Sequence, residues 1–398
     1  MEITKNVFAV GALDRDRMLF DELIPLPDGT SYNSYLIRGS DKTALIDTVD
    51  PSKYHDLLYN LKKLGIKKID YIIANHAEQD HSGSIPNILK DFPDAKIVTN
   101  AMCKEMLFDY LEIPDEKFIV VKEGEKLSLG TKALQFIMTP WVHWPETMVT
   151  YLEEDKILFS CDFFGSHNTN NQIAKEDKRQ YDAAKRYYAE IMMPFRLPIK
   201  KNMEKISKLE ILFIAPSHGP VYSNPGFIIN NYNDWISENT KDEIVIAYVS
   251  MHDSTKLLAE SLGKSLSDKK RKVIIFNITK SDIGEIAMAL VDATTVIIAS
   301  PTLVGGPHPA ALNLAYIVNI LKPKTKYAAI LGSYGWAQGI NPKLIEIMPN
   351  LKAELIDTIT IKGIPKKDDY ARLEALAEKI NKKHTILFDG GNQNDKRN

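Results

Sequence analysis

The sequence is organised around the stretch Asn75-His76-Ala77-Glu78-Gln79-Asp80-His81-Ser82-Gly83. Four of its side chains are of types that bind metal ions, namely His76, Glu78, Asp80 and His81. The apolar run Tyr71-Ile72-Ile73-Ala74 precedes them and predicts a buried strand, and a helix is expected to begin at Ser84. The four side chains therefore lie on a predicted loop at the end of a strand, where a sheet holds functional loops rigidly. Imidazole and carboxylate together suit zinc, iron or manganese.

The composition is that of a soluble globular protein, with 44% hydrophobic and 26% charged residues. The 398 residues are long for one domain and comfortable for two. The net charge of −2 offers no bulk positive field for nucleic acid or an anionic membrane. No apolar run is long enough to span a bilayer, and residues 1–5 lack the form of a signal peptide. We therefore expect a cytoplasmic protein without nucleic-acid or membrane partners.

The two cysteines, Cys103 and Cys161, exclude several cysteine-based architectures. A disulfide framework, a four-thiolate iron centre and an iron–sulfur cluster all need more thiols. An appended rubredoxin-like module would also need further cysteines, so none is expected.

Residues 1–240 mix hairpins with helices, which indicates an α/β sandwich and not a purely parallel sheet. Hairpins are predicted within 31–49, 126–138 and 147–160, and single strands at 71–74, 96–98, 118–120 and 211–214. Helices are predicted at 54–64 and 102–111, within 180–209, and through Trp235.

After the polar stretch 237–242, residues 241–398 alternate regularly between strand and helix. Strands are predicted at 244–249, 273–276, 295–299, 327–331 and 355–361. Helices are predicted near 255–267, 283–291, 310–321, 342–349 and 367–383. This alternation predicts a doubly wound parallel sheet of the flavodoxin type. The polar tail from about 389 is expected to be disordered.

Three later residues, His143, Asp162 and His218, also follow apolar strands. With the first four they give seven ligand types, which is too many for one metal ion and suits a dinuclear centre with a bridging carboxylate. Taken singly, each of these three residues has an ordinary alternative role. A histidine after a strand is often a capping or hydrogen-bonding residue, Asp162 could cap a helix, and His218-Gly219 could form a turn. The clustered quartet has no such simple alternative, and the three later residues gain weight from their shared position at strand ends.

The pattern His76-x-Glu78-x-Asp80-His81, followed by His143, Asp162 and His218, resembles the metallo-β-lactamase-fold signature. In the zinc hydrolases of that fold the loop usually reads H-x-H-x-D-H. Here Glu78 takes the place of the second histidine, and in this the chain resembles the flavodiiron proteins, also called A-type flavoproteins. A second segment that resembles this family is Pro140-Trp141-Val142-His143-Trp144-Pro145-Glu146-Thr147-Met148. An added carboxylate hardens the site and favours redox-active iron over zinc.

The resemblance implies a metallo-β-lactamase-like αββα sandwich followed by a flavodoxin-like sheet. It implies that one iron is bound by His76, Glu78 and His143, that the other is bound by Asp80, His81 and His218, and that Asp162 bridges them. His167 is expected to orient one of these ligands without binding a metal ion itself. The alternative is an ordinary loop histidine. Trp144 is expected to wall the pocket, with a core tryptophan as the alternative.

The second half offers three loops that resemble flavodoxin FMN loops, at 250–255, 300–308 and 332–336. They follow the first, third and fourth strands of the predicted sheet, whose carboxyl ends surround the crevice of this fold. Hydroxyls beside a helix N-terminus can hold a phosphate, although Ser and Thr are also common helix caps. No G-x-G-x-x-G motif supports NAD binding. The FMN-binding residues predicted from these loops are Ser250, Met251, His252, Asp253, Ser254, Thr255, Pro301, Thr302, Leu303, Val304, Gly305, Ser333, Tyr334, Gly335 and Trp336.

The resemblance implies an oxidoreductase that reduces dioxygen to water, nitric oxide to nitrous oxide, or both, at a di-iron centre re-reduced through FMN. It implies a reduced deazaflavin coenzyme or a separate rubredoxin as electron donor. It also implies a head-to-tail homodimer, and leaves a dimer of dimers open. Two alternatives remain from the residues alone: a zinc hydrolase that uses a metal-bound hydroxide and carries a flavodoxin domain, and a flavin electron carrier or gas sensor with a vestigial metal site.

Overall fold

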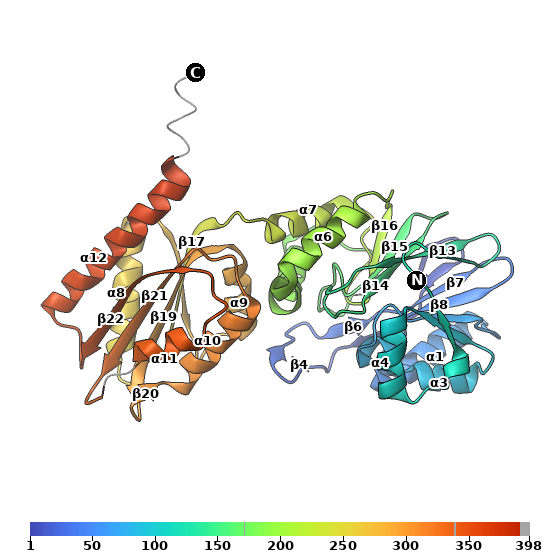
Figure 1. The fold of residues 1–398 in the computed structure, drawn as a ribbon, viewed down its shortest axis with the longest axis horizontal. Coiled ribbons are helices and arrows are strands. Elements are labelled where there is room, and N and C mark those ends of the chain that lie inside the picture. Colours follow the sequence, from blue (N-terminus) through green and yellow to red (C-terminus); the bar gives the residue numbers. More distant parts are fainter. Residues whose placement is uncertain (171, 338–339, 391–398) are drawn as a thin grey trace, which may run out of the picture. The chain divides into compact units, whose positions relative to one another are not determined.

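The computed structural model describes residues 1–170, 172–337 and 340–390. The chain divides into two units, Met1–Ile236 and Ser237–Asn398, and each is described by itself (Figure 1). Residues 391–398 of the polar tail lie outside the described residues, so the disorder expected there stays a prediction.

The first unit is built on two sheets with helices on their outer faces (Figure 1). In spatial order the first sheet contains β1 (Glu2–Thr4), β2 (Val7–Ala9), β7 (Tyr35–Arg38), β8 (Thr43–Ile46), β9 (Tyr71–Ile73), β10 (Lys96–Thr99) and β11 (Phe118–Val120). The second contains β12 (Lys126–Ser128), β13 (Ala133–Met138), β14 (Met148–Leu152), β15 (Ile157–Cys161) and β16 (Phe213–Pro216). Strands β8 to β11 pair in parallel, whereas hairpins build most of the second sheet. Both sheets are therefore assembled from hairpins and crossovers, as the sequence predicted.

The two faces of the first sheet are buried against different partners because successive side chains of a strand point to opposite faces. On β9, Ile72 joins the core formed with the helices, while Ile73 joins the core between the sheets. Across the sheet interface Ile73 shares that core with Phe136 of β13 and Phe159 of β15. The helices of this unit are α1 (Tyr54–Lys63), α2 (Gln79–Ser82), α3 (Ile85–Asp91), α4 (Ala101–Leu111), α5 (Lys178–Tyr187), α6 (Arg196–Ile206) and α7 (Pro225–Ile236). Short turns of helix lie at Pro51–Lys53, Asp115–Lys117, Tyr188–Met192 and Met193–Phe195.

The four clustered ligand-type residues that follow β9 lie only partly on a loop. Asp80 and His81 belong to α2, because the N–H groups of His81 and Ser82 donate to the carbonyl of Glu78 at 3.0 and 2.9 Å and close a helical turn. The next helix, α3, begins at Ile85 with Ser84 as its N-cap residue. A helical turn fixes the direction of these two side chains more tightly than an open loop would.

Several short strands near the N-terminus were not predicted. They are β1, β2, β3 (Ala12–Asp14), β4 (Leu19–Phe20) and β5 (Ile24–Pro25). The first strand of the hairpin predicted within 31–49 is divided in the structure into β6 (Thr30–Tyr32) and β7. β3 pairs with β6, and β4 pairs with β5. Strands of two or three residues are too short to show an alternating pattern, and the equally short β9 and β11 were predicted from continuous apolar runs instead.

The second unit is a parallel sheet in the order β18-β17-β19-β21-β22. The strands are β17 (Lys241–Tyr248), β18 (Lys272–Asn277), β19 (Ala293–Leu303), β21 (Tyr327–Tyr334) and β22 (Glu354–Lys362), with β20 (Gly306–Pro307) paired to the end of β19. Helices α8 (Ser254–Asp268) and α12 (Lys367–His384) bury one face, and α9 (Ile283–Asp292), α10 (Pro309–Leu321) and α11 (Ile340–Glu346) bury the other (Figure 1). A final turn of helix lies at Thr385–Asp389. Numbered along the chain, this strand order is the flavodoxin order, as predicted.

Among the helices of the described ranges, none combines the length and the apolar character that a membrane span requires.

Candidate functional site

The structure brings all seven predicted ligand-type side chains of the first unit together. Each comes from a position close behind a strand: His76, Glu78, Asp80 and His81 follow β9, His143 follows β13, Asp162 follows β15 and His218 follows β16. Four of them are essentially without exposed surface, namely His76, His81, Asp162 and His218. Strand ends from both sheets therefore meet at one buried cluster of imidazoles and carboxylates.

Asp162 lies between two sets of imidazoles. Its Oδ2 is 3.5 Å from Nε2 of His76 and 3.5 Å from Nε2 of His143. Its Oδ1 is 3.1 Å from Nε2 of His81 and 3.3 Å from Nε2 of His218. The two oxygens of one carboxylate thus face two different pairs of histidines.

The other two carboxylates divide in the same way. Oε2 of Glu78 is 3.1 Å from Nε2 of His76 and 3.2 Å from Nε2 of His143. Asp80 faces the other pair, with Oδ1 3.3 Å from Nε2 of His81 and Oδ2 3.2 Å from Nε2 of His218. Each set therefore contains two imidazoles, one carboxylate of its own and one oxygen of the shared Asp162.

Several polar atoms of this cluster are buried and, in the described part of the chain, have no hydrogen-bond partner beyond the close imidazole–carboxylate contacts given above. They include both carboxylate oxygens of Asp80, Nε2 of His81 and Oδ2 of Asp162. Such atoms are costly in a protein interior unless something else satisfies them. Ligand atoms of two overlapping groups, His76–Glu78–His81–Asp162 and Asp80–His81–His218, lie within 4.8 Å of one another. The residues present fit two metal ions, whereas their assignment as ligands stays a prediction.

The electrostatics of the cluster favour ionised carboxylates. Burial would lower the pKa of His143 and His218, but hydrogen bonds to Asp162 and to Glu78 or Asp80 overcome it and raise these pKa values to about 9 and about 10. Burial would likewise raise the pKa of Asp162, yet the charge of His81 and hydrogen bonds from the neighbouring imidazoles hold it well below its ordinary value. Metal binding at this cluster would therefore displace protons from the imidazoles.

Glu146 and Tyr187 contact the cluster and were not predicted. Oε1 of Glu146 is 2.6 Å from Nδ1 of His76, and the hydroxyl of Tyr187 donates to Oδ1 of Asp162 at 2.8 Å. Glu146 lies within the segment 140–148 that resembles the flavodiiron proteins, although that resemblance predicted no role for it. Tyr187 lies 25 residues from Asp162 on α5, and no local pattern marks it.

His167 and Trp144, predicted as supporting residues, both lie beside the cluster. Nδ1 of His167 is 2.9 Å from Oγ1 of Thr30, and its ring centroid is 5.1 Å from that of His218. The ring of Trp144 meets the ring of His76 edge-on, with centroids 4.9 Å apart. Both positions suit the predicted roles, which no observation here tests.

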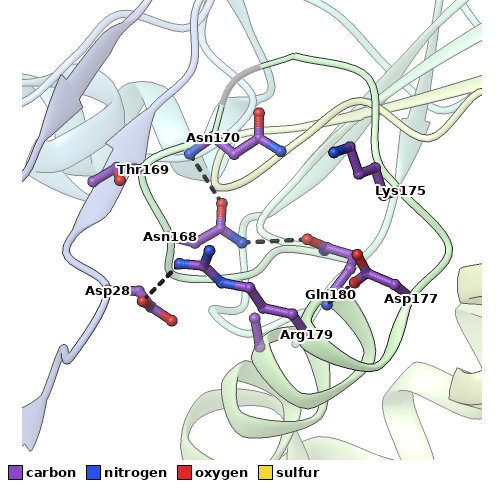
Figure 2. A pocket seen from close by; sticks show the side chains of 9 residues that line it. Asp28, Asn168, Thr169, Asn170, Lys175, Asp177, Arg179 and Gln180 are labelled. Carbon is purple, nitrogen blue, oxygen red and sulfur yellow. Dashed lines mark hydrogen bonds and ion pairs between the residues drawn. The ribbon is translucent and has the colours of Figure 1, made fainter.

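A polar cavity of about 350 Å³ begins one residue beyond His167, at Asn168. Figure 2 shows Asn168 and Gln180 joined by a hydrogen bond, and Arg179 facing Asp28 across the cavity. The buried amides of Asn168 and Gln180 also bond Ser166, and Gln180 donates to the hydroxyl of Tyr222. The hydrogen bonds of these two amides are therefore used within the protein.

A second cavity, of about 250 Å³, lies at the carboxyl ends of β17, β19, β21 and β22 in the second unit. Its lining residues are Ser250, Met251, His252, Ser254, Thr255, Pro301, Thr302, Ser333, Tyr334, Gly335 and Gly363. All except Gly363 belong to the three loops predicted for FMN. The predicted residues that do not line this cavity are Asp253, Leu303, Val304, Gly305 and Trp336. Val304 and Trp336 are 87% and 81% exposed, and their predicted contact with a cofactor stays a prediction.

The cavity carries hydroxyls suited to an anionic cofactor. Oγ1 of Thr255 and Oγ of Ser333 are 2.8 Å apart, and Thr255 is at the start of α8. Oγ of Ser250 and Oγ1 of Thr302 are buried without a hydrogen-bond partner among the residues described here. Free hydroxyls beside a helix N-terminus fit a bound phosphate group.

The comparisons with known proteins cover both units. A family profile described as "ODP family beta lactamase" matches residues 30–219. A nitric oxide reductase of Moorella thermoacetica is 35% identical over 393 residues, which cover 95% of this chain and 97% of the relative. The chain belongs to the flavodiiron protein family. A Coenzyme F420H(2) oxidase of Methanothermobacter marburgensis is 32% identical to this flavodiiron protein over 361 residues, covering 87% and 89% of the two chains.

Solved structures agree with this membership. The flavodiiron protein of Giardia intestinalis matches with a TM-score of 0.91 at 27% identity, covering 97% of this chain and 96% of its own. The rubredoxin oxygen:oxidoreductase of Desulfovibrio gigas matches with a TM-score of 0.93 at 28% identity, covering 97% and 98%. The predicted fold, a metallo-β-lactamase-like unit followed by a flavodoxin-like unit, is confirmed, and so is the class of oxidoreductase. The hydrolase alternative is not favoured.

Proposed function

We propose that this flavodiiron protein reduces dioxygen to water, and nitric oxide to nitrous oxide, at a di-iron centre in the first unit. One observation carries the proposal: Oδ2 of Asp162 faces His76 and His143 while Oδ1 faces His81 and His218. A carboxylate shared by two sets of ligands is what a dinuclear centre needs. The printed names of the relatives, a nitric oxide reductase, an F420H(2) oxidase and a rubredoxin oxygen:oxidoreductase, support both gases.

Iron is the metal that the donor set fits best. Three of the seven side chains are carboxylates, namely Glu78, Asp80 and Asp162. Negatively charged oxygen ligands beside imidazole stabilise a metal that must cycle to a higher charge. Bound iron would supply electrons to the gas, and FMN would return electrons to the iron.

The chain's own residues would hold and shield this centre. Tyr187 donates a hydrogen bond to Oδ1 of Asp162, which orients the shared carboxylate. Trp144, whose ring lies perpendicular to that of His76 with the centroids 4.9 Å apart, would limit the access of water to His76. In the second unit, the hydroxyls of Ser250, Thr255 and Thr302 would receive the phosphate of FMN at the N-terminus of α8.

The proposal includes an external electron donor and a second copy of the chain. A reduced deazaflavin coenzyme and rubredoxin are the two donors that the names of the relatives support. A head-to-tail homodimer, with a dimer of dimers as a further assembly, would let the FMN unit of one subunit face the metal centre of the other. Exposed apolar side chains suit such contacts. Met251 lines the second cavity and Trp336 follows its lining residue Gly335, while Trp141 stacks on Phe195, whose ring contacts that of His143.

Metal analysis combined with gas consumption tests the proposal. We expect about two iron ions and one FMN per chain, and consumption of dioxygen and nitric oxide when the reduced donor is supplied. Each gas is measured with the reduced deazaflavin coenzyme and with rubredoxin, which separates the two donors. Native protein that holds zinc without iron, or iron- and FMN-loaded protein that consumes neither gas, would contradict the proposal.

A further inference from the structure

Glu146 is a buried carboxylate that lies beside the metal centre but outside its seven ligand-type side chains. Its side chain has no exposed surface. Its Oε1 accepts hydrogen bonds from Nδ1 of His76 at 2.6 Å and from the N–H of Ala77 at 3.1 Å. Its backbone carbonyl accepts a hydrogen bond from Nδ2 of Asn100, the N-cap residue of α4, at 2.6 Å. Glu146 therefore links the segment before β14 to His76 through Nδ1, the ring nitrogen that faces away from Glu78 and Asp162.

This hydrogen bond determines which nitrogen of His76 faces the centre. An ionised carboxylate only accepts hydrogen bonds, so Nδ1 carries a hydrogen, and Nε2 is left to offer its lone pair once a metal ion replaces the proton that it shares with Glu78. Nε2 of His76 lies 3.1 Å from Oε2 of Glu78 and 3.5 Å from Oδ2 of Asp162, so the lone pair is aimed at the space shared by these oxygens. Pairs of carboxylate and histidine orient metal-binding imidazoles and raise their basicity.

The other set of ligands has a different partner in the corresponding place. Nδ1 of His218 donates to the backbone carbonyl of Ser31 at 2.7 Å. A carbonyl fixes the tautomer as a carboxylate does, but it adds no negative charge. Of these two histidines, only His76 has a carboxylate hydrogen-bonded to its Nδ1, so the two halves of the centre differ in the charge at this place.

We propose that Glu146 is a positioning residue that makes the metal position of His76, Glu78 and His143 the more tightly held of the two. This proposal rests on the proposed two-metal centre, and it adds that the two metal positions differ in how tightly they hold their ions. The negative charge reaches the metal through His76 and stabilises its higher oxidation state. Iron at this position therefore has the lower reduction potential.

Three variants test the role of Glu146. Glu146→Gln keeps the size and an acceptor oxygen but removes the charge, and Glu146→Asp keeps the charge. Glu153→Gln makes the same change at an exposed carboxylate that pairs with Lys126, and serves as the matched control. Iron release from each loaded protein to a chelator is followed over time, reduction potentials are titrated, and thermal unfolding of the metal-free proteins is compared.

Glu146→Gln is expected to release one of the two irons about 10- to 100-fold faster than the unmodified protein, with the other rate unchanged. In Glu146→Gln the reduction potential of the iron at that position is expected to rise. Glu146→Asp is expected to recover part of the slow iron release and part of the low potential, and Glu153→Gln is expected to change neither. Unchanged release, or equal acceleration of both irons in a destabilised metal-free protein, overturns the proposal. If native protein holds zinc and reduces no gas, the proposed function fails, and faster release of one zinc from Glu146→Gln would still support the positioning role.

Discussion

Glu78 faces two imidazoles with a single oxygen, 3.1 Å from Nε2 of His76 and 3.2 Å from Nε2 of His143. Burial would raise the pKa of Glu78, but hydrogen bonds from His143 and His76 hold it far below its ordinary value, so the carboxylate is ionised. A histidine in its place would offer a neutral nitrogen. The residue therefore contributes charge as well as a ligand atom to its half of the centre.

Glu78→His is expected to lower the iron content and the rate of gas reduction together, each by at least roughly tenfold, because a neutral ligand stabilises the oxidised metal less. Iron is measured per chain in purified protein, and dioxygen and nitric oxide consumption are measured at saturating donor. Glu153→His, which makes the same change at an exposed position, should behave as the unmodified chain. Unchanged iron content and rates in Glu78→His would refute the role of Glu78.

The first turn of α8 and the carboxyl end of β21 meet at the cavity that is proposed to hold FMN, and each supplies a hydroxyl there. Oγ1 of Thr255 lies 2.8 Å from Oγ of Ser333, and both residues line the cavity. Such a pair is held in place by the two parallel strands behind it.

Thr255→Val keeps the shape of the side chain and removes its hydroxyl. We expect FMN binding to weaken by about 1.5–3 kcal/mol, roughly ten- to a hundredfold in Kd, because a hydrogen bond to a charged phosphate is lost. Binding is measured by flavin fluorescence in titrations of the FMN-free protein. Thr279→Val, in the loop after β18 and outside the cavity, is the control. Equal affinities in all three proteins would show that Thr255 does not contact the phosphate.

Helix α12 is fastened to the sheet of the second unit through His384. Its Nδ1 is 2.6 Å from Oδ1 of Asp242, and its Nε2 is 2.7 Å from Oγ1 of Thr295. Burial lowers the pKa of His384 below its ordinary value, and the charge of Arg271 adds to this, although Asp242 acts in the opposite direction. The folded protein therefore holds the imidazole neutral at a pH where the unfolded chain already protonates it.

The second unit is expected to lose stability through His384 as the pH falls below about 6.5, because the unfolded chain then binds a proton that the folded chain excludes. Above that pH the contribution is constant. Free energies of unfolding at about pH 7.5 and about pH 5.5 are compared for the full chain and for His384→Gln. The unmodified protein should lose more stability than the variant on acidification. The same loss in both would exclude His384 as the source.

At the scale of the whole molecule, the proposed reaction needs electrons to pass from the FMN unit to the metal centre. The proposed homodimer provides that passage between subunits. Trp336 is 81% exposed and follows directly on Gly335 of the FMN cavity, so it is a suitable contact residue.

Trp336→Asp is expected to shift the protein from dimer towards monomer and to leave the iron content unchanged. Gas consumption, expressed per bound FMN, is expected to fall in proportion to the lost dimer. Sedimentation velocity measures the oligomeric state over a range of protein concentrations. Tyr370→Asp, at a 41% exposed residue of α12, is the control for a charge added to the same unit. A monomeric protein that consumes dioxygen at the full rate would contradict the homodimer.

The linear sequence by itself determined the two kinds of unit, the strand ends and the seven ligand types. Those features depend on local alternation of apolar residues and on side chains placed directly after a strand, as at His76 and Asp162. Short strands such as β3 and the helical turn at Asp80 and His81 escaped, because they are too short to have a period.

Only the tertiary structure decided which distant residues support the cluster. Glu146 meets His76 across 70 residues of sequence, and Thr30 meets His167 across 137. It also decided that the two oxygens of Asp162 face different pairs of histidines. Contacts of this kind depend on how strands from two sheets are aligned and packed, and local patterns carry no information about that alignment because they describe only residues close in the chain.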